Sequence, residues 1–261
     1  MASSNESAWR TAISEARTDD IVYRGYDLED VVDQLDFAST AFLLANGEPP
    51  SDSEARVFNA LLSATADHGI SPSQAVTRYV SASGSPIQAC VAAGVLTIGD
   101  HHGGAGEIMA ELLEDHLVAR DGESVEEVAR NLVETCQERG DRVPGYGHPE
   151  HTNGDPRTPV LVDLAREEGV AGDALELALA VEDVVTEAAG IELPMNINGV
   201  TASLLLDLGL PASFARPLVI MARVPGLIAH AIEERERERS WRMVAGGVEY
   251  DGPSDRELGD Q

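Results

Sequence analysis

SPIQACVAAGVLTIG (85–99) is the stretch of sequence that indicates the fold class most directly. It begins with Ser-Pro, a pair that commonly opens a helix, and its side chains are apolar nearly all round. A helix without a polar face has to be covered on every side. We therefore predict a central, buried helix here, surrounded by other elements of the chain.

The sequence on both sides of this stretch is also helical in pattern. SDSEARVFNALLSATAD (51–67) opens with Ser and acidic residues that suit a helix N-cap, followed by apolar residues at helical spacing. Further helices are predicted at GEIMAELLEDHLVAR (106–120), SVEEVARNLVETCQERG (124–140), DALELALAVEDVVTEAAG (173–190), TASLLLDLG (201–209), SFARPLVIMARV (213–224) and PGLIAHAIEERERER (225–239). Only IVYRGY (21–26) and WRMVAGGVEY (241–250) are plausible strands. The predicted fold class is all-α.

The charge of the chain is strongly one-sided. Asp and Glu number 46 against 18 basic residues, all of them Arg, for a formal net charge of −28. Such a surface repels nucleic acid and anionic lipid, so neither is expected as a partner. Molar salt shortens the Debye length to about 3 Å and so removes much of the self-repulsion. An acidic, lysine-free composition resembles that of proteins from salt-accumulating cells, and we expect a halophilic origin.

Other features of the composition indicate the compartment. No run approaches the length of apolar sequence that a membrane helix needs, and the N-terminus has no apolar segment after its charges. Cys90 and Cys136 have no partner motif and are expected to be two buried thiols. We therefore expect a cytoplasmic protein that does not span a membrane.

Two glycine-containing segments are candidates for a functional site. ERGDRVPGYGHPEHTNGDPRTP (138–159) is unusually long for a connection between helices, and long ordered loops are more often functional than not. HHGGAG (101–106) lacks the glycine spacing of nucleotide-binding loops, but a helix is predicted to start just after it. Free N–H groups at that helix start would suit a developing oxyanion.

The histidines divide into loop and helix positions. His68, His101, His102 and His148 occur beside glycines in loops, whereas His116 and His230 lie in predicted helices. Adjacent histidines on regular structure point in different directions, and the sequence has no HExxH motif, cysteine cluster or calcium loop. We predict no metal.

GDPRTPVLVDLARE (154–167) predicts another helix start. Thr158 can cap the helix, and Pro159 can take its first position. Arg157 then stands just before the helix, where it could bind a carboxylate ligand or pair with an acidic neighbour. Both readings remain open at this point.

Eight segments follow one another along the chain: YRGYDLEDVV (23–32), FLLANGEPPS (42–51), ADHG (66–69), HHGGAGE (101–107), PGYGHPEHTNGDPR (144–157), LPMNING (193–199), ARVPGLIAH (222–230) and RSWR (239–242). Taken in this order, they resemble the motifs of the citrate synthase family. PGYGH followed by NGDPR is the most specific of them, and the resemblance spans nearly the whole chain. A long block between the YRGY and ADHG regions is missing, so the chain resembles the short citryl-CoA lyases and the citryl-CoA lyase module of ATP-citrate lyase.

The resemblance implies a citrate synthase-like helical fold with a large domain and a small CoA-binding domain. Residues 1–106 would supply large-domain helices, residues 107–210 the small domain, and residues 211–261 a return to the large domain. A homodimer is also implied. The substrates would be a coenzyme A thioester and oxaloacetate or citrate, with citryl-CoA interconverted with acetyl-CoA and oxaloacetate.

The resemblance also implies roles for single residues. His102 would donate to the thioester carbonyl, His148 would exchange a proton with the oxaloacetate carbonyl or the citryl hydroxyl, and His68 would bind the oxaloacetate portion. The carboxylates would be held by three arginines, Arg157, Arg223 and, across a dimer interface, Arg239. The CoA adenine would be lined by the backbone of Val143, Pro144, Gly145, Tyr146 and Gly147.

Two positions depart from the family pattern. Asn198 stands where the family has the Asp that serves as general base, and an amide cannot accept that proton. Another group could serve, Glu192 being the nearest in sequence, or the reaction could need no base there. The third alternative is a non-catalytic or impaired paralogue that still binds CoA and carboxylates. Ser240 replaces a usual Pro, which leaves the clamping residue open between Arg239 and Arg242.

Overall fold

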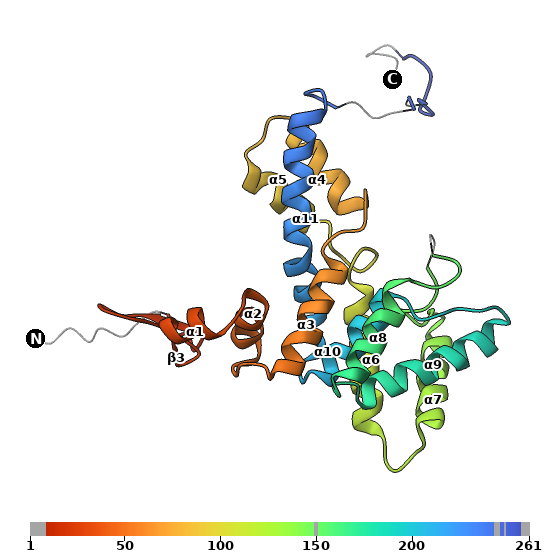
Figure 1. Ribbon diagram of the computed structural model, residues 1–261. Coiled ribbons are helices and arrows are strands. Elements are labelled where there is room, and N and C mark those ends of the chain that lie inside the picture. The colour runs from red at the N-terminus through yellow and green to blue at the C-terminus, as the bar shows by residue number, and fades with distance from the viewer. Residues whose placement is uncertain (1–8, 149–150, 243–245, 248, 257–261) are drawn as a thin grey trace, which may run out of the picture.

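The computed structural model describes residues 9–148, 151–242, 246–247 and 249–256, and almost all of its regular structure is helical. Helices α3 and α6–α10 form the lower body in Figure 1. Their bounds are α3 (Asp52–Thr65), α6 (Ala105–Ala119), α7 (Val125–Arg139), α8 (Arg157–Glu167), α9 (Asp173–Ala189) and α10 (Ile197–Asp207). One hydrophobic core runs from α2 (Phe37–Asn46) and α3 through this body to the start of α11 (Ala215–Arg237).

The capping pattern of the sequence fixes where two of these helices begin. Ser51 accepts from the backbone N–H of Glu54, whose side chain reaches back to the backbone of Ser51. Ser124 and Glu127 form the same capping box at the start of α7. Each box satisfies N–H groups that the first turn of a helix leaves free. The predicted helices at 51–67 and 124–140 are confirmed.

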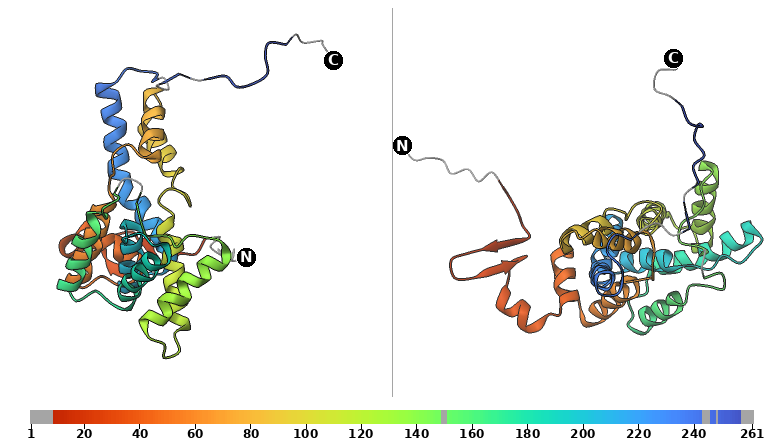
Figure 2. Two further views of the ribbon diagram at one scale, coloured as in Figure 1. Left: turned by 90° about the vertical axis from the view of Figure 1, so that its right-hand side faces the viewer. Right: turned by 90° about the horizontal axis from the view of Figure 1, so that it is seen from above.

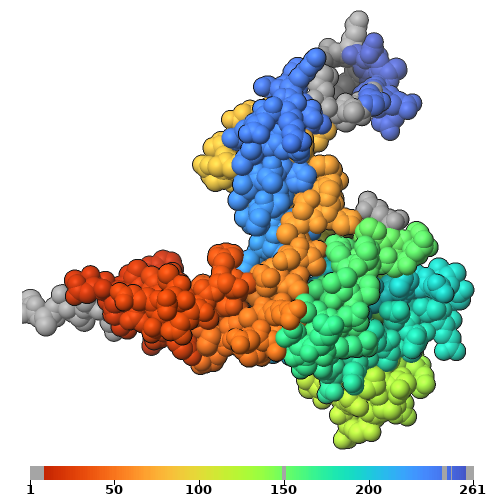
Figure 3. Space-filling view, viewed as in Figure 1, coloured from red at the N-terminus to blue at the C-terminus, as the bar shows by residue number. Residues whose placement is uncertain are grey.

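The N-terminal residues form an arm that projects from the body, as Figure 3 shows. It contains the antiparallel strands β1 (Ser14–Ala16), β2 (Ile21–Tyr23) and β3 (Tyr26–Asp27), followed by α1 (Leu28–Gln34). IVYRGY was expected as one strand, but Arg24 and Gly25 have positive φ values of 51° and 93°, so a turn divides it. The Arg24 guanidinium donates to the carbonyl of Leu44 at 2.7 Å, which ties the turn to α2.

A second extension stands upright on the body and consists of α4 (Pro72–Ala82), α5 (Ile87–Val95) and α11 (Figures 1 and 2). The sequence predicted two helices that meet at Pro225, whereas α11 continues through that proline. It does so because both of its halves are packed, the lower half by α3 and α6 and the upper half by α4 and α5. By length and composition alone, Ala212–Arg237 could cross a membrane, but core helices of this kind meet the same criterion.

The prediction of a central, buried helix at 85–99 is wrong for the single chain. Within α5 only Cys90 and Gly94 are buried, and Leu96 just beyond it is 85% exposed. Gly94 allows close contact with α4, since a Cβ there would lie 2.1 Å from Oγ1 of Thr77. The helix is covered by α4 and α11 on one side only. Its apolar composition therefore reflects surface that this chain does not cover by itself.

The C-terminal strand prediction at 241–250 falls partly outside the described residues. The residues of that stretch that the structure does describe are not in a strand. The division into domains at residues 106 and 210 stays a prediction.

Candidate active site

Five segments converge where α11 passes the body. They are the loop after α3, the start of α4, the turn before α6, the 143–157 loop and the residues before α10. The approach of α11 is close, because a Cβ at Gly226 would lie 2.5 Å from the carbonyl oxygen of Ala66. Residues far apart in sequence therefore form one polar site.

Three histidines meet at this site, two of them predicted and one not. Nε2 of His68 lies 3.0 Å from Nε2 of His151. The ring centroid of His148 is 5.6 Å from that of His68 and 4.4 Å from that of His151. The sequence analysis predicted His68 and His148 and missed His151, for which the only signal was its place in the same loop.

The backbone of His151 determines the tautomer of His148. Its N–H donates to Nδ1 of His148 at 3.1 Å. A neutral imidazole has one donor and one acceptor nitrogen, so Nε2 carries the hydrogen. Burial and then the neighbouring His151 lower the pKa of His148, and these effects outweigh the opposing influence of Asp155. The ring is therefore a neutral donor at pH 7.

The three histidines are also a group that could hold a metal ion. Their ligand atoms all lie within 4.8 Å of one another. However, a metal would need a lone pair from His148, whose Nδ1 is hydrogen bonded and whose Nε2 carries the hydrogen. Chelation would thus require that hydrogen bond to break. The prediction that the chain uses no metal stays a prediction.

The PGYGH loop is held against the segment before α10. Gly147 donates from its N–H to Pro194, and Asn196 donates to Gly145, both at 2.8 Å. Gly145 has a φ of 90°, and a Cβ on it would lie 2.9 Å from Cα of Gly199. Glycine is therefore required both for the turn and for the close approach of the two segments.

A cavity of about 420 Å³ adjoins this loop between α7 and α9. Of the predicted CoA-binding residues, Val143 and Tyr146 line it, together with Val133, Arg142 and Leu193. The Tyr146 hydroxyl donates to the carbonyl of Ala178 at 2.6 Å. Burial, with the nearby Glu182, raises the pKa of Tyr146 well above its ordinary value. This tyrosine therefore fixes the loop rather than titrating.

Asp155 organises the starts of two helices. Its carboxylate accepts from the backbone N–H groups of Arg157 and Ile197, the first residues of α8 and α10, each at 3.1 Å. Burial alone would raise its pKa, but the bonds from Arg157 and Ile197 lower the pKa of Asp155 to about 2. The predicted cap at Thr158 is wrong, because α8 already begins at Arg157 and the Thr158 hydroxyl donates to Met195 instead.

The predicted arginines occupy different places. Arg157 binds Asp155 through two nitrogens, so of the two alternatives that the sequence left open it is the pairing with an acidic neighbour that the structure shows. Arg223 is buried, donates to the carbonyl of Thr65 at 3.1 Å and interacts electrostatically with Asp67 and Arg157. Burial lowers the pKa of the Arg223 guanidinium. The structure thus brings Arg157 and Arg223 together at the site.

Arg239 does not reach this site within the chain. It lies just beyond the end of α11, and the helix from Arg223 to Arg237 already spans about 21 Å at 1.5 Å per residue. Arg242 is bound by Glu234 at 2.6 and 2.9 Å. The sequence left open whether Arg239 or Arg242 would bind the substrate carboxylate. Arg242 is already ion-paired within its own chain.

His102 lies in the turn before α6. Its Nε2 is 3.0 Å from Oγ of Ser73, and burial and then the charge of Arg223 lower its pKa. The glycines that follow it pack tightly within the turn, since a Cβ at Gly104 would lie 2.7 Å from the carbonyl oxygen of Gly99. The suggested oxyanion site at the start of α6 stays a prediction.

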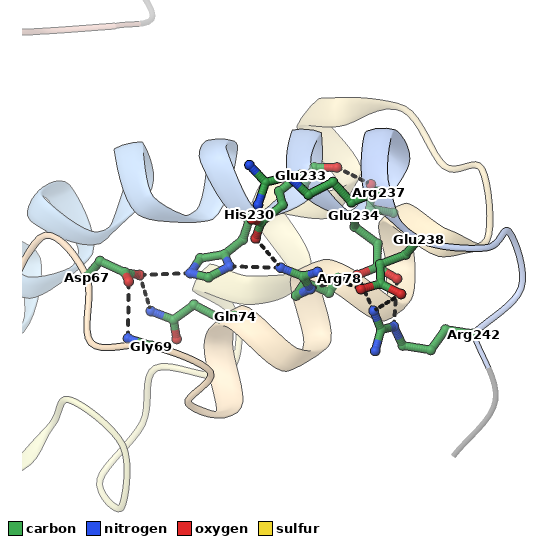
Figure 4. Close-up of polar contacts among 12 residues, drawn as sticks. Asp67, Gly69, Gln74, Arg78, His230, Glu233, Glu234, Arg237, Glu238 and Arg242 are labelled. Carbon is green, nitrogen blue, oxygen red and sulfur yellow. Dashed lines mark hydrogen bonds and ion pairs between the residues drawn. The ribbon is translucent and has the colours of Figure 1, made fainter. Parts of the chain in front are cut away.

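Figure 4 shows a polar network that sequence reasoning missed. Asp67 accepts from the side chain of Gln74 at 2.8 Å and from Nε2 of His230 at 3.2 Å. Nδ1 of His230 lies 3.3 Å from the Arg78 guanidinium, which also binds the buried Glu234. The only sequence signal was the position of Asp67 beside His68.

Asn198 lies in the first turn of α10, where its backbone N–H donates to Oδ1 of Asn196 at 2.9 Å. The alternative base Glu192 is exposed. The carboxylates that bind this segment are instead Asp155, at the N–H of Ile197, and Glu182, which accepts from the N–H of Met195 at 2.8 Å. Glu192 therefore gains no support from the structure as a replacement base.

Sequence comparison gives a match over most of the chain. The family profile described as "Citrate synthase, C-terminal domain" matches residues 3–65 and 48–244. The citrate synthase of Haloferax volcanii is 30% identical over 236 residues, which cover 89% of this chain and 59% of that protein. Citrate synthase 2 of Bacillus subtilis is 29% identical, with 80% and 54% covered. The chain thus spans a little over half the length of the curated relatives it matches.

Structural comparison confirms the predicted helical fold. The citryl-CoA lyase of Hydrogenobacter thermophilus matches with a TM-score of 0.88 at 34% identity, covering 96% of this chain and 97% of that one. The ATP citrate lyase of Methanothrix soehngenii, solved with citrate and coenzyme A, gives a TM-score of 0.80 at 24% identity over 95% of this chain and 42% of that one. At 24% identity, the match to the ATP citrate lyase shows a shared fold and no more.

Proposed function

Since the chain belongs to the citrate synthase family, we propose that it interconverts citryl-CoA with acetyl-CoA and oxaloacetate. The observation that carries the proposal is the match to a citryl-CoA lyase over almost the full length of both chains. The likeness to citrate synthases, in contrast, covers little more than half of those proteins. Cleavage of citryl-CoA is therefore the direction that the comparison favours.

The geometry of the site supports this chemistry. His148 offers a neutral N–H donor, which suits an oxygen that gains or loses charge as the carbon–carbon bond changes. The His68 ring packs edge-on against the His148 ring, with the two ring centroids 5.6 Å apart. The nearby Arg223 supplies positive charge for a substrate with several carboxylates, beside Arg157, whose charge is paired with Asp155. Coenzyme A would enter along the cavity lined by Val143 and Tyr146.

A homodimer belongs to the same proposal. Helices α4, α5 and α11 stand away from the body in Figure 2. Their surface carries exposed apolar side chains. These include Tyr79, Leu96, Ile228 and Ile232. A second copy covering this surface would explain the apolar sequence of α5 and could bring the distant Arg239 to the partner's site. Light scattering after size exclusion in molar KCl is expected to give twice the mass of one chain.

Asn198 supports a second candidate, a CoA- and carboxylate-binding protein without turnover. The loss of a positioned base typically costs about 10²–10⁴-fold in rate. In molar KCl the enzyme is expected to cleave citryl-CoA, or to release free CoA from acetyl-CoA and oxaloacetate. His148→Ala should abolish either reaction, and His101→Ala, at an exposed neighbour of His102, is the matched control.

The two candidates differ in their outcomes. The binding protein would show thermal stabilisation by acyl-CoA and oxaloacetate without turnover, and Asn198→Asp would restore some activity. The absence of turnover with any pair of acyl-CoA and 2-oxoacid would refute the enzymatic proposal.

A further inference from the structure

We propose that Asn196 is a positioning residue for His148, because its side-chain amide holds the peptide unit that leads into that histidine. The inference deepens the proposed function and rests on it for the reaction that His148 serves. It follows from the bonds of the Asn196 amide, from the backbone pairing around it and from the conformation of Gly147.

The two ends of the Asn196 amide have partners of opposite kind. Its Oδ1 accepts from the backbone N–H of Asn198 at 2.9 Å, which caps the start of α10. Its Nδ2 donates to the carbonyl oxygen of Gly147 at 2.5 Å. A backbone N–H can only donate and a carbonyl can only accept, so the two partners fix the amide in one orientation. The residue is only 6% exposed, so solvent competes little for these bonds.

Backbone pairing holds the PGYGH loop only as far as the N–H of Gly147. The loop and the segment before α10 run antiparallel and pair through their backbones. Along the part of the loop that the structure describes, this pairing ends at the N–H of Gly147, which donates to Pro194 at 2.8 Å. The next group is the Gly147 carbonyl, which the Asn196 side chain binds instead. That carbonyl belongs to the peptide unit that ends at the nitrogen of His148.

Glycine at position 147 makes this peptide unit dependent on the Asn196 bond. The φ of Gly147 is 68°, in the left-handed region, and a Cβ there would lie 3.1 Å from Cδ2 of Leu193. Because glycine has no side chain to restrict its backbone, the peptide unit between Gly147 and His148 can turn at little cost once its carbonyl is free. The His148 ring would turn with it.

The place of the His148 ring determines its contacts with two other histidines. Its centroid lies 4.4 Å from that of His151 and 5.6 Å from that of His68. Burial and then His151 lower the pKa of His148, so a ring that left this place would regain a more ordinary pKa. A misplacement of about 1 Å at a reacting group can cost about 10²-fold in rate. The Asn196 bond therefore bears on both the pKa and the reactivity of His148.

The first test reads the pKa of His148 and needs no activity. Asn196→Gly removes the donor to Gly147 without adding a charge, and glycine is well tolerated at an N-cap. The chain is labelled with ¹⁵N-histidine and titrated in molar KCl, and the His148 signals are assigned with His148→Gln. We expect the pKa of His148 to rise toward its ordinary value of about 6.5 in the Asn196→Gly variant.

The matched control is Ser124→Ala, which removes the N-cap of α7. It should leave the pKa of His148 as it is in the natural chain. An unchanged His148 pKa in Asn196→Gly, or an equal rise in both variants, would overturn the proposal whatever reaction the protein catalyses.

The second test separates turnover from ligand binding. Asn196→Gly is expected to lower kcat by about 10²-fold, the cost of a small misplacement. The Kd of CoA, measured by calorimetry, should change little, because the Tyr146 hydroxyl still binds the carbonyl of Ala178 and the backbone pairing of Gly145 remains. An equal loss of kcat and CoA affinity would show that the whole loop had come away, which contradicts a role confined to His148.

The third test uses Asn196→Asp, which has the shape of the natural side chain and still accepts from Asn198. An ionised carboxylate cannot donate to Gly147, whereas a protonated carboxyl can. Burial and the carboxylates of Asp155 and Glu182, which bind the N–H groups on either side, would raise the pKa of the new carboxyl. We therefore expect the kcat of this variant, relative to the natural chain at the same pH, to rise as the pH falls.

Taking this ratio removes the titration of the histidines that both proteins share. A ratio that stays constant with pH would refute the role of the bond to Gly147. If the natural chain shows no turnover at all, the proposed function fails, and the pKa measurement on His148 still decides the role of Asn196.

Discussion

Asp155, in the loop that leads into α8, binds Arg157 at the start of that helix through both carboxylate oxygens, at 2.8 and 2.7 Å. The same carboxylate accepts from the N–H of Ile197. This one side chain therefore joins the loop that carries His148 to the helix that carries Asn198.

Replacing this carboxylate is expected to lower stability in a pH-dependent way. The pKa of Asp155 is about 2 in the folded chain against an ordinary 3.8, which corresponds to about 2 kcal/mol. A lowered folded pKa gives stability that is complete above the unfolded pKa and is lost as the pH falls toward 2. Asp155→Asn should therefore unfold about 2 kcal/mol more easily at pH 7, and less so at pH 3, in urea titrations. Asp163→Asn, at an exposed residue of α8, is the control and should change little.

The backbone N–H of His151 is expected to support the donor role of His148. His151→Pro removes that N–H, whereas His151→Ala keeps it and removes only the ring. One hydrogen bond contributes about 0.5–1.5 kcal/mol, so the proline variant should lose up to about tenfold in kcat relative to the alanine variant. Equal rates for the two variants, with circular dichroism showing both folded, would contradict this role.

The ion-pair network at the end of α11 is expected to hold the upright helices together. Glu234 is 1% exposed and binds both Arg78 and Arg242. Removing one partner of a buried pair leaves an uncompensated charge, which costs about 3–5 kcal/mol. Because Arg78 keeps its bond to Glu233, we expect Glu234→Gln to lower the free energy of unfolding toward the lower end of that range.

The control for this variant is Glu236→Gln, which removes the same charge from an exposed position on the same helix. Thermal unfolding in molar KCl would compare the two. A similar Tm for both variants would show that the network contributes little to stability.

Salt is expected to stabilise the whole chain. At a net charge of −28, repulsion between surface carboxylates opposes the compact state, and screening reduces it as the Debye length falls from about 10 Å at 0.1 M to about 3 Å at 1 M. The Tm measured by calorimetry should rise steadily with KCl over this range. Sodium chloride should act almost equally, and a flat Tm would show that the charges are already compensated locally.

Local sequence patterns predicted the helices well where a capping box determines the residue at which the helix begins. The Ser51–Glu54 and Ser124–Glu127 boxes are closed within four residues, so no distant contact is needed to read them. At Thr158 the same reasoning failed, because α8 begins one residue earlier and its first N–H is bonded by Asp155, which also binds Ile197 more than forty positions away. The helix at 85–99 was predicted correctly in type but not in burial, since burial depends on what the rest of the fold covers.

The sequence by itself determined the helical class and the family, because both are encoded in local patterns and short motifs, and it predicted His68, His102 and His148 as site residues. Only the tertiary structure decided that His151 lies against His68 and His148, and that Arg157 pairs with Asp155 while Arg239 lies beyond the end of α11. The physical reason is that contacts between separate segments depend on how the helices pack. His68 and His151, for example, are 83 positions apart in the sequence.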